Sequence, residues 1–431
     1  MIFLFGRVVG LKKGFDIKGF AVGCGLQLLA FSLLTGAAVG SIPDNIYVAA
    51  GKEKEIFFNV PMRAQISGEA VSAVSVKNQK GEDDISLDLS TPFYIDAEEE
   101  ARVDAELSIL GIPVKTVSVN VMKDKNIVPC GNITGVTMKT DGVLVLGAGV
   151  VTGENGNDSS PARGKLEAGD IIKSINGKDI DDKDDLARIV NEYTEGSFEL
   201  TVIRRGREFK ADIRPFKAID GNKLGVWVRD STQGLGTITY YDDENKSFAA
   251  LGHGIYDVDT GSLMTVKEGC VTRAEVTGVK KGEKGVPGEV LGTLFKDDEL
   301  GDILKNTECG LYGEMRDTGV YLLEDKSMPI GLRYEVNEGE AFILSDIGGE
   351  KEEYSINIES IDRYGGRKDK SLLITITDER LLGKTGGIIQ GMSGSPIIQD
   401  GKLVGAVTHV LVNDPTRGYG IFSENMPDAA A

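Results

Sequence analysis

One serine stands in a turn of small residues that is suited to present a nucleophile. The segment Gly391-Met392-Ser393-Gly394-Ser395-Pro396 is followed by an apolar stretch, an Asp-Gly turn and a second apolar stretch. A serine that attacks a carbonyl carbon needs backbone N–H groups that converge on the oxygen that becomes negatively charged. Flanking glycines let the backbone approach that point. The pattern predicts Ser393 as a nucleophile, with the amides of Gly391 and Ser393 as an oxyanion hole.

The chain has two histidines, and either could serve such a nucleophile as a base. His253 ends an apolar stretch and stands between Gly252 and Gly254, which leave room for a substrate beside the ring. A general base must reach the serine hydroxyl while its other nitrogen is oriented by a partner. We therefore predict that His253 is the base. The alternative is that His253 only ends a strand and forms its hydrogen bonds with the backbone. His409 follows the hairpin after Ser393. The resemblance of this hairpin to that of trypsin-like peptidases implies that His409 lines a substrate cleft, with a role as base as its second possibility.

A carboxylate that orients the imidazole would complete this site, but the local sequence leaves several candidates. Asp378 ends the apolar and threonine-rich segment 372–377, and an acid at a strand end could stabilise the imidazolium. Asp378 as the N-cap of a short helix over 379–383 is almost as well supported locally. The other candidate acids are Asp257, Asp259 and Asp414.

The serine turn and its hairpin resemble the nucleophile loop of trypsin-like serine peptidases. This resemblance implies a double β-barrel peptidase domain, which we place at residues 218–431. The interval from His253 to Ser393 is long enough to put the two residues on separate halves of such a domain. Asp378 departs from the trypsin-like pattern, because the acid of those enzymes lies much further upstream of the serine.

From about residue 131 to its end, the chain resembles the stage IV sporulation protein B family of spore-forming bacteria. The likeness is carried by seven motifs: Val228-Arg229-Asp230-Ser231, Gly234-Leu235-Gly236-Thr237, Ala250-Leu251-Gly252-His253, Asp378-Glu379-Arg380-Leu381-Leu382, the segment 385–398, Val407-Thr408-His409-Val410, and Asn413-Asp414-Pro415-Thr416. In that family, the functional residues are the histidine of the Leu-Gly-His motif, the aspartate of the Thr-Asp motif and the first serine of Gly-Met-Ser-Gly-Ser-Pro. The resemblance therefore implies that His253, Asp378 and Ser393 are catalytic.

The same resemblance implies a membrane-associated signalling serine endopeptidase without a cofactor, in which a PDZ domain precedes the peptidase domain. Members of the family act during sporulation, in the space between the two membranes around the forespore. They cleave themselves and a regulator of an intramembrane metalloprotease complex, which activates a late sigma factor. The alternative is a PDZ-centred adaptor whose peptidase domain is idle and which signals by binding.

Residues 131–217 are similar to a PDZ domain of the bacterial peptidase type. The segment Gly142-Val143-Leu144-Val145-Leu146-Gly147 is the expected carboxylate-loop strand, and residues 184–190 form an expected amphipathic helix. Such domains add a peptide strand to an open sheet edge and hold its terminal carboxylate with loop amides. We therefore expect residues 142–147 to bind the end of a peptide. The alternative is a PDZ fold that only packs against the peptidase domain.

The amino-terminal region indicates export. Residues 19–43 contain no charged side chain, whereas lysines precede them. An apolar run of about 20 residues spans a bilayer as a helix, and lysines hold the preceding end in the cytoplasm. We expect residues 1–18 to be cytoplasmic and residues 19–43 to be a transmembrane anchor, with a cleaved signal peptide as the alternative. Residues 44–130 contain short segments in which apolar and polar residues alternate, and this pattern predicts a small β-rich spacer.

Composition supports an extracytoplasmic protein that is mainly β-structure. With 431 residues, 56 glycines and 12 prolines, the chain suits several turn-rich domains. Its net charge of −19 argues against nucleic acid as a partner and against adhesion to an anionic membrane surface. Its four cysteines show no Cys-x-x-Cys spacing, so we expect at most one disulfide and no metal site.

Overall fold

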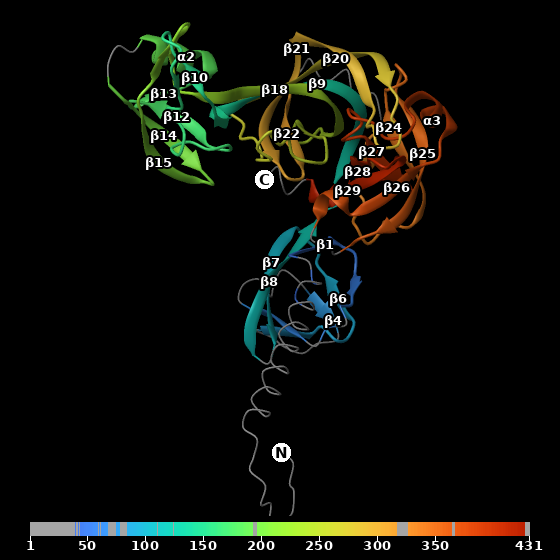
Figure 1. The fold of residues 1–431 in the computed structure, drawn as a ribbon. Coiled ribbons are helices and arrows are strands. Elements are labelled where there is room, and N and C mark those ends of the chain that lie inside the picture. Colours follow the sequence, from blue (N-terminus) through green and yellow to red (C-terminus); the bar gives the residue numbers. More distant parts are fainter. Residues whose placement is uncertain are drawn as a thin grey trace, which may run out of the picture. The chain divides into compact units, whose positions relative to one another are not determined.

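The computed structural model describes residues 39–426, apart from residues 40–41, 43, 59, 61, 68–74, 78–83, 110, 124, 193–195, 317–325 and 364–366. The chain divides into two compact units, residues 1–122 and 123–431. The described residues form mainly β-structure, as predicted (Figure 1).

Most of the predicted transmembrane segment 19–43, with the preceding residues 1–18, lies outside the described residues. Within the described ranges, no helix is long and apolar enough to cross a membrane. The anchor stays a prediction.

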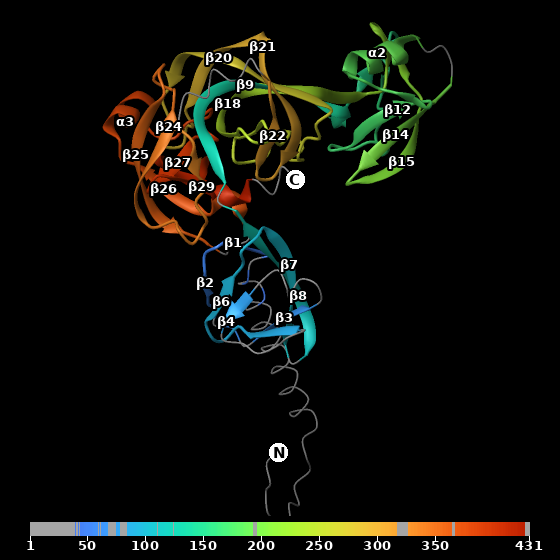
Figure 2. The same cartoon turned by 180° about the vertical axis from the view of Figure 1, so that it is seen from behind.

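The first unit consists of two small sheets. One contains β1 (Asn45–Ala49), β8 (Ile112–Met122), β7 (Ala101–Ile109), β3 (Arg63–Ser67) and β5 (Asp84–Asp88) in that order. The other contains β2 (Lys54–Ile56), β6 (Phe93–Asp96) and β4 (Ser75–Lys77). Buried side chains from both sheets, such as Ile66 and Phe93, share one core, and Figure 2 shows the sheets side by side. The predicted spacer was placed at residues 44–130, whereas this unit ends at Met122.

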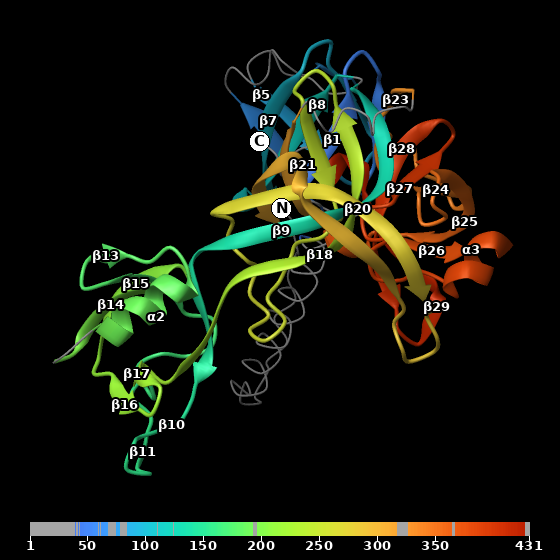
Figure 3. The ribbon, with the colours of Figure 1, turned by 90° about the horizontal axis from the view of Figure 1, so that it is seen from above.

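Two long strands organise the second unit. β9 (Asn126–Ala148) and β18 (Val226–Asp242) pair in antiparallel register over most of their length, and Figure 3 shows them running together. Near its end β9 pairs with β12 (Ile171–Ile175), and in its middle, at residues 134–139, with β20 (Glu268–Lys280). The chain between β9 and β18 therefore leaves one barrel strand and returns on its neighbour. We expected the peptidase domain to begin at residue 218, and this stays a prediction; the barrel formed by the chain after that residue also includes β9, which begins at Asn126.

The first barrel is a ring of six strands. β9, β18, β19, β22, β21 and β20 pair in this order, and β20 pairs back with β9. The bounds of the further strands are β19 (Ser247–Ala250), β21 (Glu289–Thr307) and β22 (Gly310–Met315); β23 (Met328–Pro329) adds to β9.

The second barrel is also a closed ring of six strands. Its order is β24 (Gly339–Ser345), β25 (Glu352–Ile361), β26 (Leu372–Ile376), β29 (Asp414–Phe422), β28 (Lys402–Leu411) and β27 (Pro396–Gln399). The predicted hairpin after Ser393 is formed by β27 and β28 around Asp400 and Gly401, both of which have a positive φ. The short helices are η3 (Lys368–Lys370), α3 (Glu379–Thr385) and η4 (Ser423–Asn425). Two barrels are thus present, as expected.

The segment between β9 and β18 has its own core, which includes Val143, Leu186 and Phe198. Its elements are β10 (Val151–Thr152), β11 (Asp158–Ser159), β12, β13 (Lys178–Asp179), α2 (Lys183–Glu192), β14 (Phe198–Arg204), β15 (Arg207–Ile213), β16 (Phe216–Ala218) and β17 (Gly221–Lys223). Helix α2 contains the predicted residues 184–190 and buries Leu186 and Val190 against that core. The assignment of a PDZ domain stays a prediction.

The expected peptide-binding strand Gly142–Gly147 has neighbours on both sides. Val143 and Leu144 pair with β12, while Leu144, Val145 and Gly147 pair with β18. The Val145 amide donates to Asp170 O at 2.8 Å, and the Val145 carbonyl accepts from Gly169 N at 2.9 Å. Because both strand edges are already paired, these residues do not offer the open edge that the prediction required.

Candidate active site

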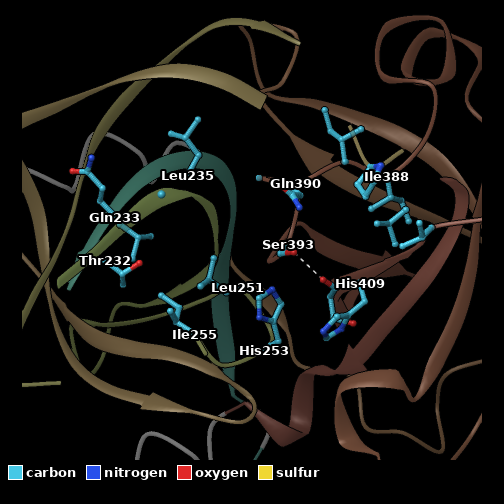
Figure 4. A pocket seen from close by; sticks show the side chains of 18 residues that line it. Thr232, Gln233, Leu235, Leu251, His253, Ile255, Ile388, Gln390, Ser393 and His409 are labelled. Carbon is cyan, nitrogen blue, oxygen red and sulfur yellow. Dashed lines mark hydrogen bonds between the residues drawn. The ribbon is translucent and has the colours of Figure 1, made fainter. Parts of the chain in front are cut away.

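Residues of both barrels line one cavity of about 500 Å³. Thr232 and Leu235 come from β18 of the first barrel, whereas His409 and Val410 come from β28 of the second. Ser393 and His253 also line it, and Figure 4 shows Ser393 near the centre of the view, with His253 and His409 below it. The structure thus brings together the predicted nucleophile and both histidines.

Thr237, in the middle of β18, fixes the serine turn from the opposite barrel. Its amide donates to Ser393 O at 3.0 Å, and its hydroxyl donates to Gly391 O at 2.7 Å. Its carbonyl accepts from Leu251 N at 3.1 Å, two residues before His253. One buried threonine therefore connects the backbone turns that carry Ser393 and His253.

The glycines of the serine turn are required by its geometry. Gly391 and Gly394 have φ values of 103° and 99°, in the region that other residues rarely adopt. A Cβ atom on Gly394 would lie 2.1 Å from Thr237 O. The turn therefore approaches β18 more closely than a side chain at residue 394 would permit.

Two amides of the turn remain available for an oxyanion. The Gly394 amide donates to Val407 O at 2.8 Å. Among the hydrogen bonds of the described residues, none is donated by the amide of Gly391 or Ser393. These are the two groups that the sequence predicted as the oxyanion hole.

The imidazole of His253 is held by its own backbone. Nδ1 lies 2.8 Å from Gly254 O, and because a carbonyl oxygen can only accept, Nδ1 must carry the hydrogen. The lone pair of the neutral ring is then on Nε2, where a base needs it. Burial lowers the pKa of His253, which favours this neutral form. Leu251 and Gly252, with φ values of 69° and 67°, form the left-handed turn that leads into His253.

Ser393 does not yet engage that base. Its hydroxyl donates to Thr408 O at 2.8 Å, shown as the dashed line in Figure 4. His253 makes its hydrogen bond to Gly254, and no hydrogen bond joins it to Ser393 in the described structure. The nucleophile and the base face one cavity, but the proton path between them requires the Ser393 side chain to rotate.

His409 stands beside His253, with ring centroids 5.0 Å apart at an angle of 40°. Its Nδ1 lies 3.7 Å from Asp369 Oδ2 and is buried without a hydrogen-bond partner in the described residues. Burial, followed by the charge of His253, lowers the pKa of His409 to about 4. Asp369 was not predicted as a site residue, because no motif marks it within Lys368-Asp369-Lys370.

Asp378 is the N-cap of α3 and not the partner of a histidine. Its carboxylate accepts from the amides of Arg380 at 2.9 Å and Leu381 at 3.3 Å, and from Arg380 Nη2 at 2.8 Å. The Arg380 side chain, above all, lowers the pKa of Asp378 to about 2. Asp378 is not among the residues that line the cavity. The structure therefore shows the helix-cap alternative, and no hydrogen bond of the described residues joins Asp378 to His253.

The other candidate acids also have structural partners. Asp257 is buried and, with Asp259, binds the guanidinium of Arg229. Asp414 accepts from the Thr416 hydroxyl at 2.7 Å. None of these three lines the cavity.

The described part of the chain contains no group of three or more His, Cys, Asp or Glu residues that could hold a metal ion. Within this part of the chain, Cys130, Cys270 and Cys309 form no disulfide bond.

Comparison with known proteins finds a family model that matches the part of the chain in which the site residues lie. Residues 220–427 match the family model described as SpoIVB peptidase S55. None of the curated proteins matches the chain.

Two of the solved structures that match are proteases. The HtrA-type protease AlgW, solved with a decapeptide, is 11% identical with a TM-score of 0.27, and the match covers 46% of this chain and 51% of that chain. An inactive form of the Rv3671c protease is 11% identical with a TM-score of 0.26, over 46% and 82% of the two chains. This chain thus spans about half the length of AlgW, and similarities this low carry no argument about the site.

Proposed function

Because residues 220–427 belong to the SpoIVB peptidase S55 family, we propose that this protein is a serine endopeptidase with Ser393 as nucleophile and His253 as general base. The observation that carries the proposal is the shared cavity, which Ser393, His253 and Gly391 line. Gly254 O occupies Nδ1 of His253 and leaves Nε2 for the proton, and within the described residues the amides of Gly391 and Ser393 donate no hydrogen bond. This combination supplies a nucleophile, a base and an oxyanion site.

In the proposed mechanism, the Ser393 side chain rotates away from Thr408 and gives its proton to His253 Nε2. The Ser393 oxygen bonds to the carbonyl carbon of the scissile peptide, whose oxygen becomes an anion held by the amides of Gly391 and Ser393. His253 then gives the proton to the leaving amine, and water releases the acyl group by the reverse sequence. The Gly254 carbonyl takes the orienting role that is usually played by a carboxylate.

We further propose a role in sporulation signalling. The support is the family to which residues 220–427 belong and the motifs that resemble it. The protein would be exported, held at the membrane by residues 19–43, and would act between the two membranes around the forespore. Its protein substrates would be the chain itself and a regulator of an intramembrane metalloprotease complex.

One observation favours the adaptor as a second candidate function. The Ser393 hydroxyl is bound to Thr408 O and not to His253, so the described site is not set for proton transfer. An idle peptidase domain would keep this arrangement when a partner binds.

Labelling with a serine-reactive phosphonate separates the two candidates. The purified full-length chain is incubated with the phosphonate, digested and read by mass spectrometry. An active site predicts a covalent adduct on Ser393 that is lost in His253→Ala, which removes the base. A wild-type chain that stays unlabelled and uncleaved would favour the adaptor. Spore formation that is unaffected by Ser393→Ala would contradict the signalling role of the peptidase.

A further inference from the structure

One hairpin of the first barrel reaches across to the second. β20 and β21 stay paired up to the loop 281–288 that joins them, and Figure 3 shows the two strands extending from the first barrel to the second. We call residues 276–290 the arm. Val290 is buried in the core of the second barrel, and Val276 and Val279 pack against that core. The arm therefore belongs to one barrel by its strands and packs in the other.

The arm binds the segment that leads into the serine turn by backbone hydrogen bonds. The Gln390 amide donates to Gly288 O at 2.9 Å, and Gln390 O accepts from the Val290 amide at 2.9 Å. Gln390 directly precedes Gly391, whose amide is one half of the proposed oxyanion site. Both backbone groups of the residue before that site are thus held by the arm.

The bond to Gln390 O fixes the direction of the Gly391 amide. These two groups belong to the same peptide group, and no peptide bond of the described residues is cis. In a trans peptide the carbonyl and the N–H point in opposite directions, so the N–H points away from Val290. Gly391 lines the cavity, and among the described residues its amide donates no hydrogen bond. The N–H is therefore open to an oxyanion only while the carbonyl stays on the arm.

The serine turn by itself also permits the reverse orientation. Glycine adopts both signs of φ, so Gly391 allows the peptide group before it to rotate by about half a turn. Rotation would bring Gln390 O to the place of the oxyanion and would turn the N–H towards β21. An oxygen in that place would repel the developing negative charge instead of stabilising it. The hydrogen bond from Val290 opposes this rotation, because the rotation breaks it.

Resting on the proposed peptidase function, we infer that Val290 is a positioning residue. Its amide holds the peptide group Gln390–Gly391 in the orientation in which the Gly391 amide can bind an oxyanion. The arm of the first barrel thereby completes the oxyanion site of the second. Val290 acts through Gly391 and takes no part in proton transfer. Thr237 binds Gly391 O, which belongs to the next peptide group, so the two hydrogen bonds control different parts of the turn.

The inference is tested by removing the amide hydrogen of Val290. Proline has no N–H, and because this hydrogen is given to Gln390 O, Val290→Pro removes that bond and no hydrogen bond between β20 and β21. The full-length chain is labelled with the serine-reactive phosphonate, whose phosphoryl oxygen must enter the oxyanion site. The limiting rate of labelling at Ser393 should fall by about tenfold or more. The phosphonate concentration that gives half of this rate should stay within about threefold of the wild type.

Lys284→Pro is the matched control in the same arm. Two backbone hydrogen bonds between Glu283 and Val286 close a turn, in which Gly285 has a φ of 83°. Proline is favoured at the position of Lys284 in such a turn, and Lys284 is exposed. Lys284→Pro should therefore be labelled as fast as the wild type. If Val290→Pro were folded by denaturant unfolding and labelled at the wild-type rate, the inference would be overturned and the peptidase function would stand.

Two further measurements separate a failure of the inference from misfolding and from a failure of the peptidase function. The hydroxy-acid analogue of valine at residue 290 turns the amide into an ester and keeps the side chain, so its labelling should slow like that of Val290→Pro. If the wild type were not labelled at all, the peptidase function would fall, and a crystal structure of this ester variant would decide the inference. A Gln390 carbonyl turned towards Ser393 would support it, and a carbonyl that still faces β21 would overturn it.

Discussion

The hydroxyl of Ser393 donates its hydrogen bond to the carbonyl oxygen of Thr408, at a distance of 2.8 Å. Thr408 belongs to β28 and directly precedes His409, so the Ser393 hydroxyl is held by its own barrel, whereas the backbone of its turn is bound to Thr237 of the barrel that carries His253. A neutral hydrogen bond of this kind contributes about 1 kcal/mol. Its loss is a small cost compared with a chemical barrier, and the backbone of the turn is already fixed by Thr237. Side-chain rotation, without rebuilding of the turn, would therefore make the site competent.

The two serines of the turn should behave differently when each is changed to alanine. Ser393→Ala should abolish self-cleavage and substrate cleavage, a loss of roughly 10⁴-fold or more, because only binding and the oxyanion site remain. The Ser395 hydroxyl is buried without a hydrogen-bond partner in the described structure. Ser395→Ala should therefore keep its activity and be as stable as the wild type or more stable, by up to about 1 kcal/mol. Fragment analysis and denaturant unfolding measure both; an inactive but folded Ser395→Ala would reverse the assignment.

The role of Asp378 can be decided by its replacement with asparagine. Asparagine is also a good N-cap, so Asp378→Asn keeps the bonds to the α3 amides and loses mainly the ion pair with the exposed side chain of Arg380, worth about 1 kcal/mol. We expect kcat/KM within about threefold of the wild type and an unchanged pH profile. If Asp378 instead oriented His253, the fall would be about 10²- to 10⁴-fold. A fall of that size with an intact fold would return Asp378 to the mechanism.

The turns at the active site could be predicted because their signals are local. Ser393, its glycines and the Asp-Gly hairpin are contiguous in sequence, and His253 is marked by its glycines. The environment of Asp378 could not be predicted in this way. The same few residues are compatible with a helix cap and with a histidine partner, and only the fold shows that the carboxylate faces Arg380.

The place of β9 in the first barrel could not be predicted for a different reason. β9 joins its barrel by pairing with β18 and β20, across the inserted segment between β9 and β18. Such pairings span about 80 or more residues of sequence, and strand periodicity carries no information about distant partners. The pairing of both edges of Gly142–Gly147 follows from the same topology, so it was missed as well.

Acid should destabilise the fold through His409. Its pKa is about 4 in the folded chain and about 6.5 when unfolded, so between these values the unfolded state binds more protons. Stability is therefore fully present above about pH 6.5 and is lost as the pH falls towards 4. Denaturant unfolding at pH 7.5 and 5.5 should show this loss, and His409→Gln should reduce it. His253, whose pKa is also lowered, contributes in the same direction, so part of the loss should remain. An identical pH dependence in His409→Gln would show that His409 is not buried in its neutral form.

The last prediction compares two threonines on β18 that share burial and differ in bonding. Thr237 and Thr239 are both fully buried. The Thr237 hydroxyl donates to Gly391 O at 2.7 Å, whereas the Thr239 hydroxyl has no hydrogen-bond partner in the part of the chain that the structure describes. Valine has nearly the same shape as threonine, so each Thr→Val change removes the hydroxyl and keeps the volume.

Thr237→Val should lower kcat by about tenfold or more, because the Gly391 carbonyl belongs to the peptide group between the two oxyanion amides and would no longer be fixed. It should also cost about 1–2 kcal/mol of stability, since a buried carbonyl loses a donor. Thr239→Val should leave kcat unchanged and should not lower stability. Steady-state kinetics and denaturant unfolding of both variants test this pair. If both variants lost activity equally, the packing of β18 would position Ser393, and the single hydrogen bond from Thr237 would not.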